Sequence, residues 1–124
     1  GAARAAVDLA LHSLRPPKDV ARLIDRIFVR FGLRPPPAGH AYQASFGHLM
    51  GPYAAGYYTY LTSLNRALDL YSRVGPAFAD PAAGRDYRRE ILAPGGERGM
   101  DEAARAFLGR EPDPRALERF LSGL

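Results

Sequence analysis

The sequence contains no cysteine, a single lysine and no long apolar run. Without cysteine, the chain can form neither disulfides nor thiolate metal sites. It contains no apolar run of the roughly 20 residues that a membrane-spanning helix needs. Asp8 and His12 interrupt the apolar part of the amino-terminal segment, so no secretory signal is predicted. We therefore expect a cytoplasmic protein with no membrane partner.

The cationic side chains are sixteen arginines and Lys18, and the formal net charge is +4. A basic chain can bind nucleic acid, but a phosphate-binding surface needs its cations clustered on one face. Here the arginines are spread along the chain and mixed with acids, as in residues 85–90 and 110–119. Since only the net charge supports nucleic-acid binding, we expect no nucleic-acid partner.

Apolar residues recur at helical spacing along most of the chain, and no stretch alternates as a strand would. This pattern predicts an all-α fold with a single helical region over residues 1–124, a length that suits one domain. The expected helices cover residues 2–14, 20–31, 53–74, 81–92, 101–108 and 114–121, and residues 33–45 are expected to form a loop.

Residues at the expected helix ends support these boundaries. Asp19, Asp101 and Asp113 stand where N-cap residues belong, and Gly32 stands where a C-cap belongs. Asp8 and Asp69 are expected to form ordinary helical ion pairs with nearby arginines. The inward face of the first helix is expected to carry Ala6, Leu9, Ala10 and Leu14.

The segment from Phe46 to Leu61, FGHLMGPYAAGYYTYL, is called the tyrosine segment below. It holds four of the seven tyrosines, His48 and three glycines, and it has no charged side chain. Glycine lets a backbone move or approach a ligand closely, and phenol and imidazole groups can hydrogen-bond to one. The segment is therefore suited to close over a ligand.

Three phenols of the tyrosine segment, Tyr53, Tyr57 and Tyr60, are spaced i, i+4 and i+7, so they would share one face of the helix expected over 53–74. Two interpretations are open. The phenols could form an aromatic core stripe whose hydroxyls reach the surface, or a row of donors facing a peptide or an oxyanion. The glycines that bracket His48 favour the second interpretation, because core helices rarely start through such a loop.

The sequence contains no complete catalytic apparatus. HExxH, Gly-x-Ser-x-Gly and the phosphate-binding loop are all absent. His12, His40 and His48 are spaced too far apart to give a local metal site, so no bound metal is expected. His12 is expected to be a solvated or core histidine, and His40 alone indicates nothing. His48 differs only through its glycine and tyrosine neighbours.

The tyrosine segment is similar to the pattern F-x-H-L-x-G-G-Y-x-A-x-Y-Y-x-Y-L, although Pro52 replaces its second glycine. Residues 8–12 resemble D-x-x-L-H. Further matches are residues 84–88 to G-x-x-Y-R, 91–96 to I-L-x-P-G-G and 107–112 to F-L-G-R-x-P. These motifs, in this order, resemble those of zinc oligopeptidases of the thimet oligopeptidase, neurolysin and oligopeptidase F type, and they cover essentially the whole chain.

The resemblance implies the C-terminal, substrate-binding part of a two-lobed, mostly helical zinc metallopeptidase that hydrolyses short peptides. The zinc of the complete enzyme would be held by an HExxH helix and a downstream glutamate, which this chain does not contain. A long tyrosine-bearing central helix would lie opposite the metal. The residues implied to bind substrate are His48, Tyr53, Gly47 and Gly51, and those implied to be catalytic, at the scissile carbonyl oxygen, are Tyr57 and Tyr60.

We expect the isolated chain to lack peptidase activity and to bind no stoichiometric zinc. Its partners would be short peptides and a complementary HExxH-bearing part, if the chain is a fragment, a split-gene subunit or a processed product. The alternative is a non-catalytic helical module that binds a peptide or protein through the same tyrosine face. Such a module, without the metal-binding half, would expose apolar surface and associate with itself or another chain.

Overall fold

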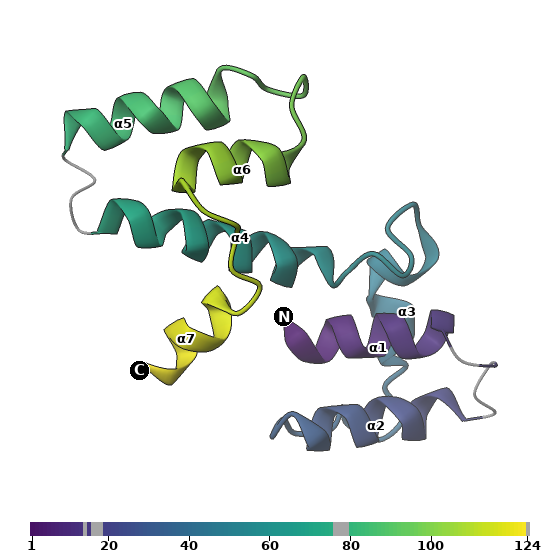
Figure 1. Ribbon diagram of the computed structural model, residues 1–124. Helices are drawn as coiled ribbons and strands as arrows, with labels where there is room; N and C mark the ends of the chain where they lie inside the picture. The colour runs from purple at the N-terminus through teal and green to yellow at the C-terminus, as the bar shows by residue number, and fades with distance from the viewer. Residues whose placement is uncertain (14, 16–18, 76–79, 124) are drawn as a thin grey trace. The chain divides into compact units, whose positions relative to one another are not determined.

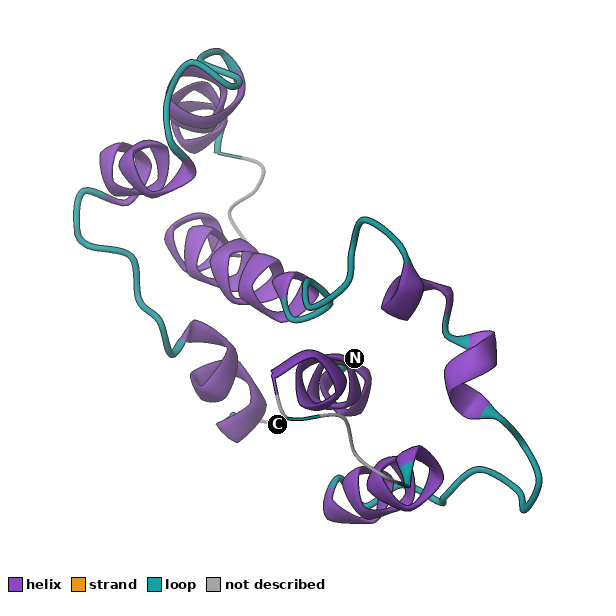
Figure 2. Cartoon of the chain, turned by 90° about the vertical axis from the view of Figure 1, so that its right-hand side faces the viewer, coloured by secondary structure: helices purple, strands orange, loops and turns teal. Residues whose placement is uncertain are grey.

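The computed structural model describes residues 1–13, 15, 19–75 and 80–123. These residues form helices joined by loops and turns and include no strand (Figure 2), which confirms the all-α prediction. The chain divides into two compact units, Gly1–Thr62 and Ser63–Leu124, called unit 1 and unit 2 below. Leu14, expected on the inward face of the first helix, and part of the turn-rich stretch before residue 80 lie outside the described residues.

The described residues of unit 1 form two longer helices and two short helical turns, and they include the start of a third long helix (Figure 1). The two longer helices pack against each other. The two short turns were not predicted, because four residues are too few to show a helical period. The elements are α1 (Ala2–Ser13), α2 (Val20–Arg30), α3 (Tyr42–Ser45), the 3₁₀ turn η1 (Gly47–Met50) and α4 (Thr59–Val74).

Both ends of α2 follow from local chemistry. The Asp19 carboxylate accepts the Arg22 N–H at 3.0 Å, which confirms the predicted N-cap. At the other end the C-cap is Phe31, and Gly32 follows it with a left-handed φ of 67°. Gly32 therefore occupies the position after the cap, where glycine most often closes a helix.

The core of unit 1 forms where α1, α2 and the tyrosine segment meet. Its buried side chains are Val7, Ile24, Phe46 and Leu49. The predicted inward face of α1 was wrong: Leu9 is 37% exposed, and the buried residues of the helix are Ala3, Ala5, Val7 and Asp8. Alanine occurs on several sides of α1, so spacing alone cannot choose between faces of nearly equal hydrophobicity.

The long helix starts later than predicted. α4 begins at Thr59, and both Tyr53 and Tyr57 lie in the preceding turn rather than on the helix. Within that turn Ala55 has a φ of 58°, outside the helical region. Two backbone N–H groups of the turn donate to the carboxylate of Asp8 on α1. A contact across more than 40 residues therefore replaces the first turns of the expected helix.

Among its described residues, unit 2 contains the remainder of α4 and further helical elements. The core side chains are Leu70 and Val74 from α4 and Ala104 and Phe107 from a later helix. The elements are α5 (Pro81–Tyr87), continued by the π-helical turn η3 (Arg88–Leu92), then α6 (Met100–Leu108) and α7 (Ala116–Ser122). α6 packs against η3. The helices predicted over residues 101–108 and 114–121 are present as α6 and α7, which begin at Met100 and Ala116.

Two predicted caps in unit 2 were wrong. Asp101 lies in the first turn of α6, whose N-cap is Gly99. Asp113 accepts the N–H of Arg115, and Arg115 is itself the N-cap of α7. In both cases the true cap lacks a side-chain cap bond, so residue preference gives no signal at that position.

The carboxylate of Asp69 is fully buried in unit 2. It accepts the Arg110 guanidinium at 2.6 Å and the Asp113 N–H at 2.7 Å. The expected ion pair within the helix was therefore wrong, since the partners lie in the segment that joins α6 to α7. Buried carboxylates need such partners because an unpaired charge is costly away from water.

Candidate functional site

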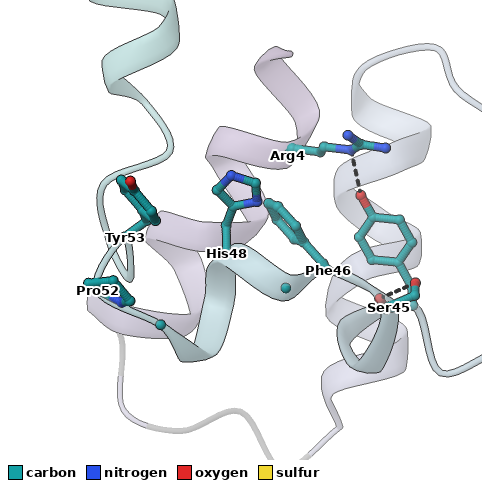
Figure 3. A pocket seen from close by; sticks show the side chains of 9 residues that line it. Arg4, Ser45, Phe46, His48, Pro52 and Tyr53 are labelled. Carbon is teal, nitrogen blue, oxygen red and sulfur yellow. Dashed lines mark hydrogen bonds between the residues drawn. The ribbon is translucent and has the colours of Figure 1, made fainter.

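An open pocket of about 600 Å³ lies in unit 1 beside η1 (Figure 3). Arg4 of α1 and Phe46 line it, together with His48 of η1 and Tyr53 of the following turn. Figure 3 shows the His48 ring between Tyr53 and Phe46. The pocket thus combines aromatic rings with imidazole, phenol, hydroxyl and guanidinium groups.

His48 is the centre of an aromatic cluster. Its ring centroid lies 5.7 Å from that of Tyr53, 5.1 Å from that of Tyr57 and 6.2 Å from that of Tyr60. Tyr57 and Tyr60 also contact each other, with centroids 4.9 Å apart. These separations are those of interacting aromatic rings. The structure therefore brings together the four side chains that the sequence singled out, which we call the His48 cluster.

The three phenols reach His48 by a different route from the one predicted. Tyr53 and Tyr57 come from the turn and only Tyr60 from α4, so the shared helix face was wrong. Tyr53 is 65% and Tyr60 58% exposed, whereas Tyr57 is partly buried against the unit 1 core. Tyr57 therefore packs partly against the core and keeps some exposed surface, while the other two phenols are more accessible to a ligand.

Gly47 and Gly51 both line the pocket. A Cβ atom at Gly47 would meet nothing within 4 Å, and one at Gly51 would make only an ordinary contact of 3.8 Å with the Gly47 carbonyl oxygen. Neither backbone conformation requires glycine. Their effect is to leave the pocket wall beside His48 without side chains, so that a ligand could approach the main chain closely.

The turn after η1 depends on two residues with special backbone properties. Pro52 is the second residue of a turn in which the Ala54 N–H donates to the Gly51 carbonyl at 3.0 Å, and proline is favoured there. A Cβ atom at Gly56 would lie 3.0 Å from the Tyr53 carbonyl oxygen, so a side chain here would require the turn backbone to shift. Pro52 thus fits the observed turn without loss of a hydrogen bond.

Arg4 is a pocket residue that the sequence did not indicate. Its Nε donates to the Tyr42 phenol at 3.2 Å, and its guanidinium carbon lies 5.8 Å from the Phe46 ring centroid. The phenols of Tyr57 and then Tyr42 raise the pKa of Arg4 above its ordinary value. None of the described carboxylates forms an ion pair with it. The pocket therefore carries a permanent positive charge.

The described part of the chain does not offer a metal site. No three of its His, Asp or Glu side chains are grouped so that they could hold an ion. His12 is occupied locally, because its Nδ1 lies 2.8 Å from the Asp8 carbonyl oxygen. These residues do not fit a resident zinc ion, whose structural and catalytic sites take at least three protein ligands.

Comparison with known proteins identifies the family. Residues 2–122 match the sequence model of peptidase family M3. Organellar oligopeptidase A of Arabidopsis thaliana is 34% identical over 93% of this chain and 16% of its own length. Oligopeptidase A of Salmonella typhimurium is 31% identical over 89% of this chain and 17% of its own. Saccharolysin of Saccharomyces cerevisiae is 39% identical over 59% of this chain and 10% of its own. The chain thus spans about a sixth or less of these relatives, and it belongs to peptidase family M3.

Proposed function

We propose that this chain is the substrate-binding part of a zinc oligopeptidase and that its ligands are short peptides. The observation that carries the proposal is the convergence of three phenols on the imidazole of His48, which itself lines an open, glycine-walled pocket together with Tyr53. Membership of family M3 and the oligopeptidase names of relatives support the same class of substrate.

Each member of the His48 cluster has a role in this proposal. His48 and Tyr53 contact the substrate backbone, to which imidazole and phenol groups can hydrogen-bond. Tyr57 and Tyr60 donate to the scissile carbonyl oxygen. A neutral phenol suits this task because its hydrogen bond strengthens as negative charge develops on the oxygen. Arg4 attracts a carboxylate of the peptide, since its guanidinium lines the same pocket.

The metal chemistry belongs to a different polypeptide segment. We propose that zinc, which supplies an activated water for peptide hydrolysis, is held by a complementary HExxH-bearing part. The proposal rests on the family resemblance and on the absence of an HExxH motif from these 124 residues. This chain contributes substrate contacts and hydrogen-bond donors to the assembled site.

Replacement of His48 by alanine is expected to weaken peptide binding to the isolated chain by about fivefold or more, as loss of a central contact residue does. Isothermal titration calorimetry with a short peptide up to about 1 mM measures this change. His40→Ala is the matched control, because His40 is exposed and does not line the pocket. The same peptide with an amidated carboxyl terminus is expected to bind more weakly because it cannot pair with Arg4. Equal affinities for the His48 and His40 variants would contradict the proposal.

A second candidate function is a non-catalytic module that binds a peptide or protein. Several large apolar side chains are exposed, among them Met50 at 91% and Leu92 at 60%, and such surface favours association. The complementary peptidase part or a second copy of the chain could cover it. The mass of the native particle, with or without a co-purifying chain, distinguishes the two functions.

A cytoplasmic location is also part of the proposal. None of the helices among the described residues is long and apolar enough to cross a membrane. The relatives differ in compartment by name, since one is a probable cytosolic oligopeptidase A and another is chloroplastic and mitochondrial, both from Arabidopsis thaliana.

A further inference from the structure

Asp8 of α1 is a buried carboxylate with backbone partners far along the chain. Its side chain is 0% exposed, although aspartate is rarely buried without compensation. Oδ1 accepts the Ala55 N–H at 3.0 Å and Oδ2 accepts the Tyr57 N–H at 2.9 Å. Both oxygens are thus directed to the turn that carries Tyr57.

His12 is the third group bound to this carboxylate. Its Nδ1 lies 3.1 Å from Oδ1 of Asp8 and 2.8 Å from the Asp8 carbonyl oxygen. Both neighbours are acceptors, so Nδ1 carries the proton and donates it. Because His12 is one helical turn after Asp8, the imidazole fixes the carboxylate against its own helix.

The turn held by Asp8 is unfavourable on its own. Ala55 has a φ of 58°, which a residue with a side chain rarely adopts, and such a conformation persists only where its surroundings impose it. The residues around it also have helical spacing and could extend α4 backwards. The two N–H bonds to Asp8 stabilise the turn in place of that extension.

We propose that Asp8, oriented by His12, is a positioning residue that holds the turn of Ala55 and Tyr57 and so places the Tyr57 ring against His48. It does not touch the substrate. It acts through Tyr57, whose ring contacts those of His48 and Tyr60 with centroid separations of 5.1 and 4.9 Å. The consequence for peptide binding rests on the proposed function, whereas the consequence for the turn does not.

Hydrogen exchange of individual backbone amides, followed by NMR on the full 124-residue chain, tests the proposal. Asp8→Asn keeps the shape of the side chain but sets an NH₂ group against one of the two N–H donors. We expect the amides of Ala55 and Tyr57 to exchange about 10- to 100-fold faster, as loss of a hydrogen bond to a charged group implies. The amide of Ile27 in α2 is expected to keep its rate.

Asp19→Asn is the matched control, since Asp19 also accepts a backbone N–H in unit 1 but at an exposed helix end, where asparagine caps equally well. His12→Ala provides a second variant should Asp8→Asn fail to fold, and it is expected to accelerate the same two amides. His12→Asn, which retains an N–H donor near Nδ1, is expected to restore their rates.

Unchanged exchange at Ala55 and Tyr57 in the folded Asp8 variant would overturn the proposal. Equal acceleration throughout unit 1 would also overturn it, because Asp8 would then stabilise the whole unit and not the turn. Peptide affinity is measured on the same samples. A variant with a loosened turn and unchanged affinity would support Asp8 as the positioning residue and would contradict the substrate role of Tyr57.

Discussion

Zinc-dependent cleavage of a short quenched peptide is expected only when the chain is combined with an HExxH-bearing part of an M3 peptidase. The chain lacks the HExxH motif, and no three His, Asp or Glu side chains among its described residues are placed to hold a metal ion. The proposed complementary part would hold the metal but lack the His48 cluster. Each component alone is therefore expected to give no cleavage above background, and the chain alone no stoichiometric zinc.

The control for this experiment is a complementary part in which the HExxH glutamate has been replaced. It should associate with the chain without restoring cleavage, because the general base of that motif is lost. Zinc-dependent cleavage by the pure chain, removed by a chelator and restored by zinc, would contradict the proposed division of the active site.

Tyr60→Phe in the restored enzyme is expected to lower turnover by about 10²–10³, the usual cost of losing one oxyanion donor. Phenylalanine keeps the ring contacts with His48 and Tyr57 and removes only the hydroxyl, so zinc content should not change. Steady-state kinetics and metal analysis on the same preparation measure both quantities.

Tyr58→Phe is the control for the Tyr60 variant. This variant also loses a tyrosine hydroxyl, at a position two residues before Tyr60. The Tyr58 side chain is 43% exposed and, among the described residues, makes no ring contact with His48. The Tyr58 variant should retain normal turnover. A Tyr60 variant as fast as the Tyr58 variant would reject the proposed hydrogen bond to the carbonyl oxygen.

Much of the fold follows from helical periodicity and end signals. The helix over Val20–Arg30 was predicted almost to the residue, because its apolar spacing is strong and Asp19 caps it. The start of α4 was missed because the same spacing continues back through Tyr57 and Tyr53. The helix begins only at Thr59, because the N–H groups of Ala55 and Tyr57 before it donate to the carboxylate of Asp8. No local pattern in the sequence reveals this distant partner.

The membership of the His48 cluster could be predicted, but its geometry could not. The tyrosine segment is unusual enough in composition and motif to single out His48, Tyr53, Tyr57 and Tyr60. Their convergence depends on a turn and not on the helix face that the spacing suggested. Arg4 was missed because it reaches the pocket from α1, and its contact with Tyr42 joins positions 38 residues apart.

The most direct test of the central claim is to map where a short peptide binds on the isolated chain by NMR chemical-shift changes. The claim is that the His48 cluster and its pocket form the substrate-contacting surface. It predicts that the largest shifts occur at His48, Tyr53, Tyr57 and Tyr60 in unit 1, with saturation on titration, while Ser63–Leu124 remains largely unaffected. Saturable shifts confined to unit 2, or none in the His48 cluster, would contradict the account.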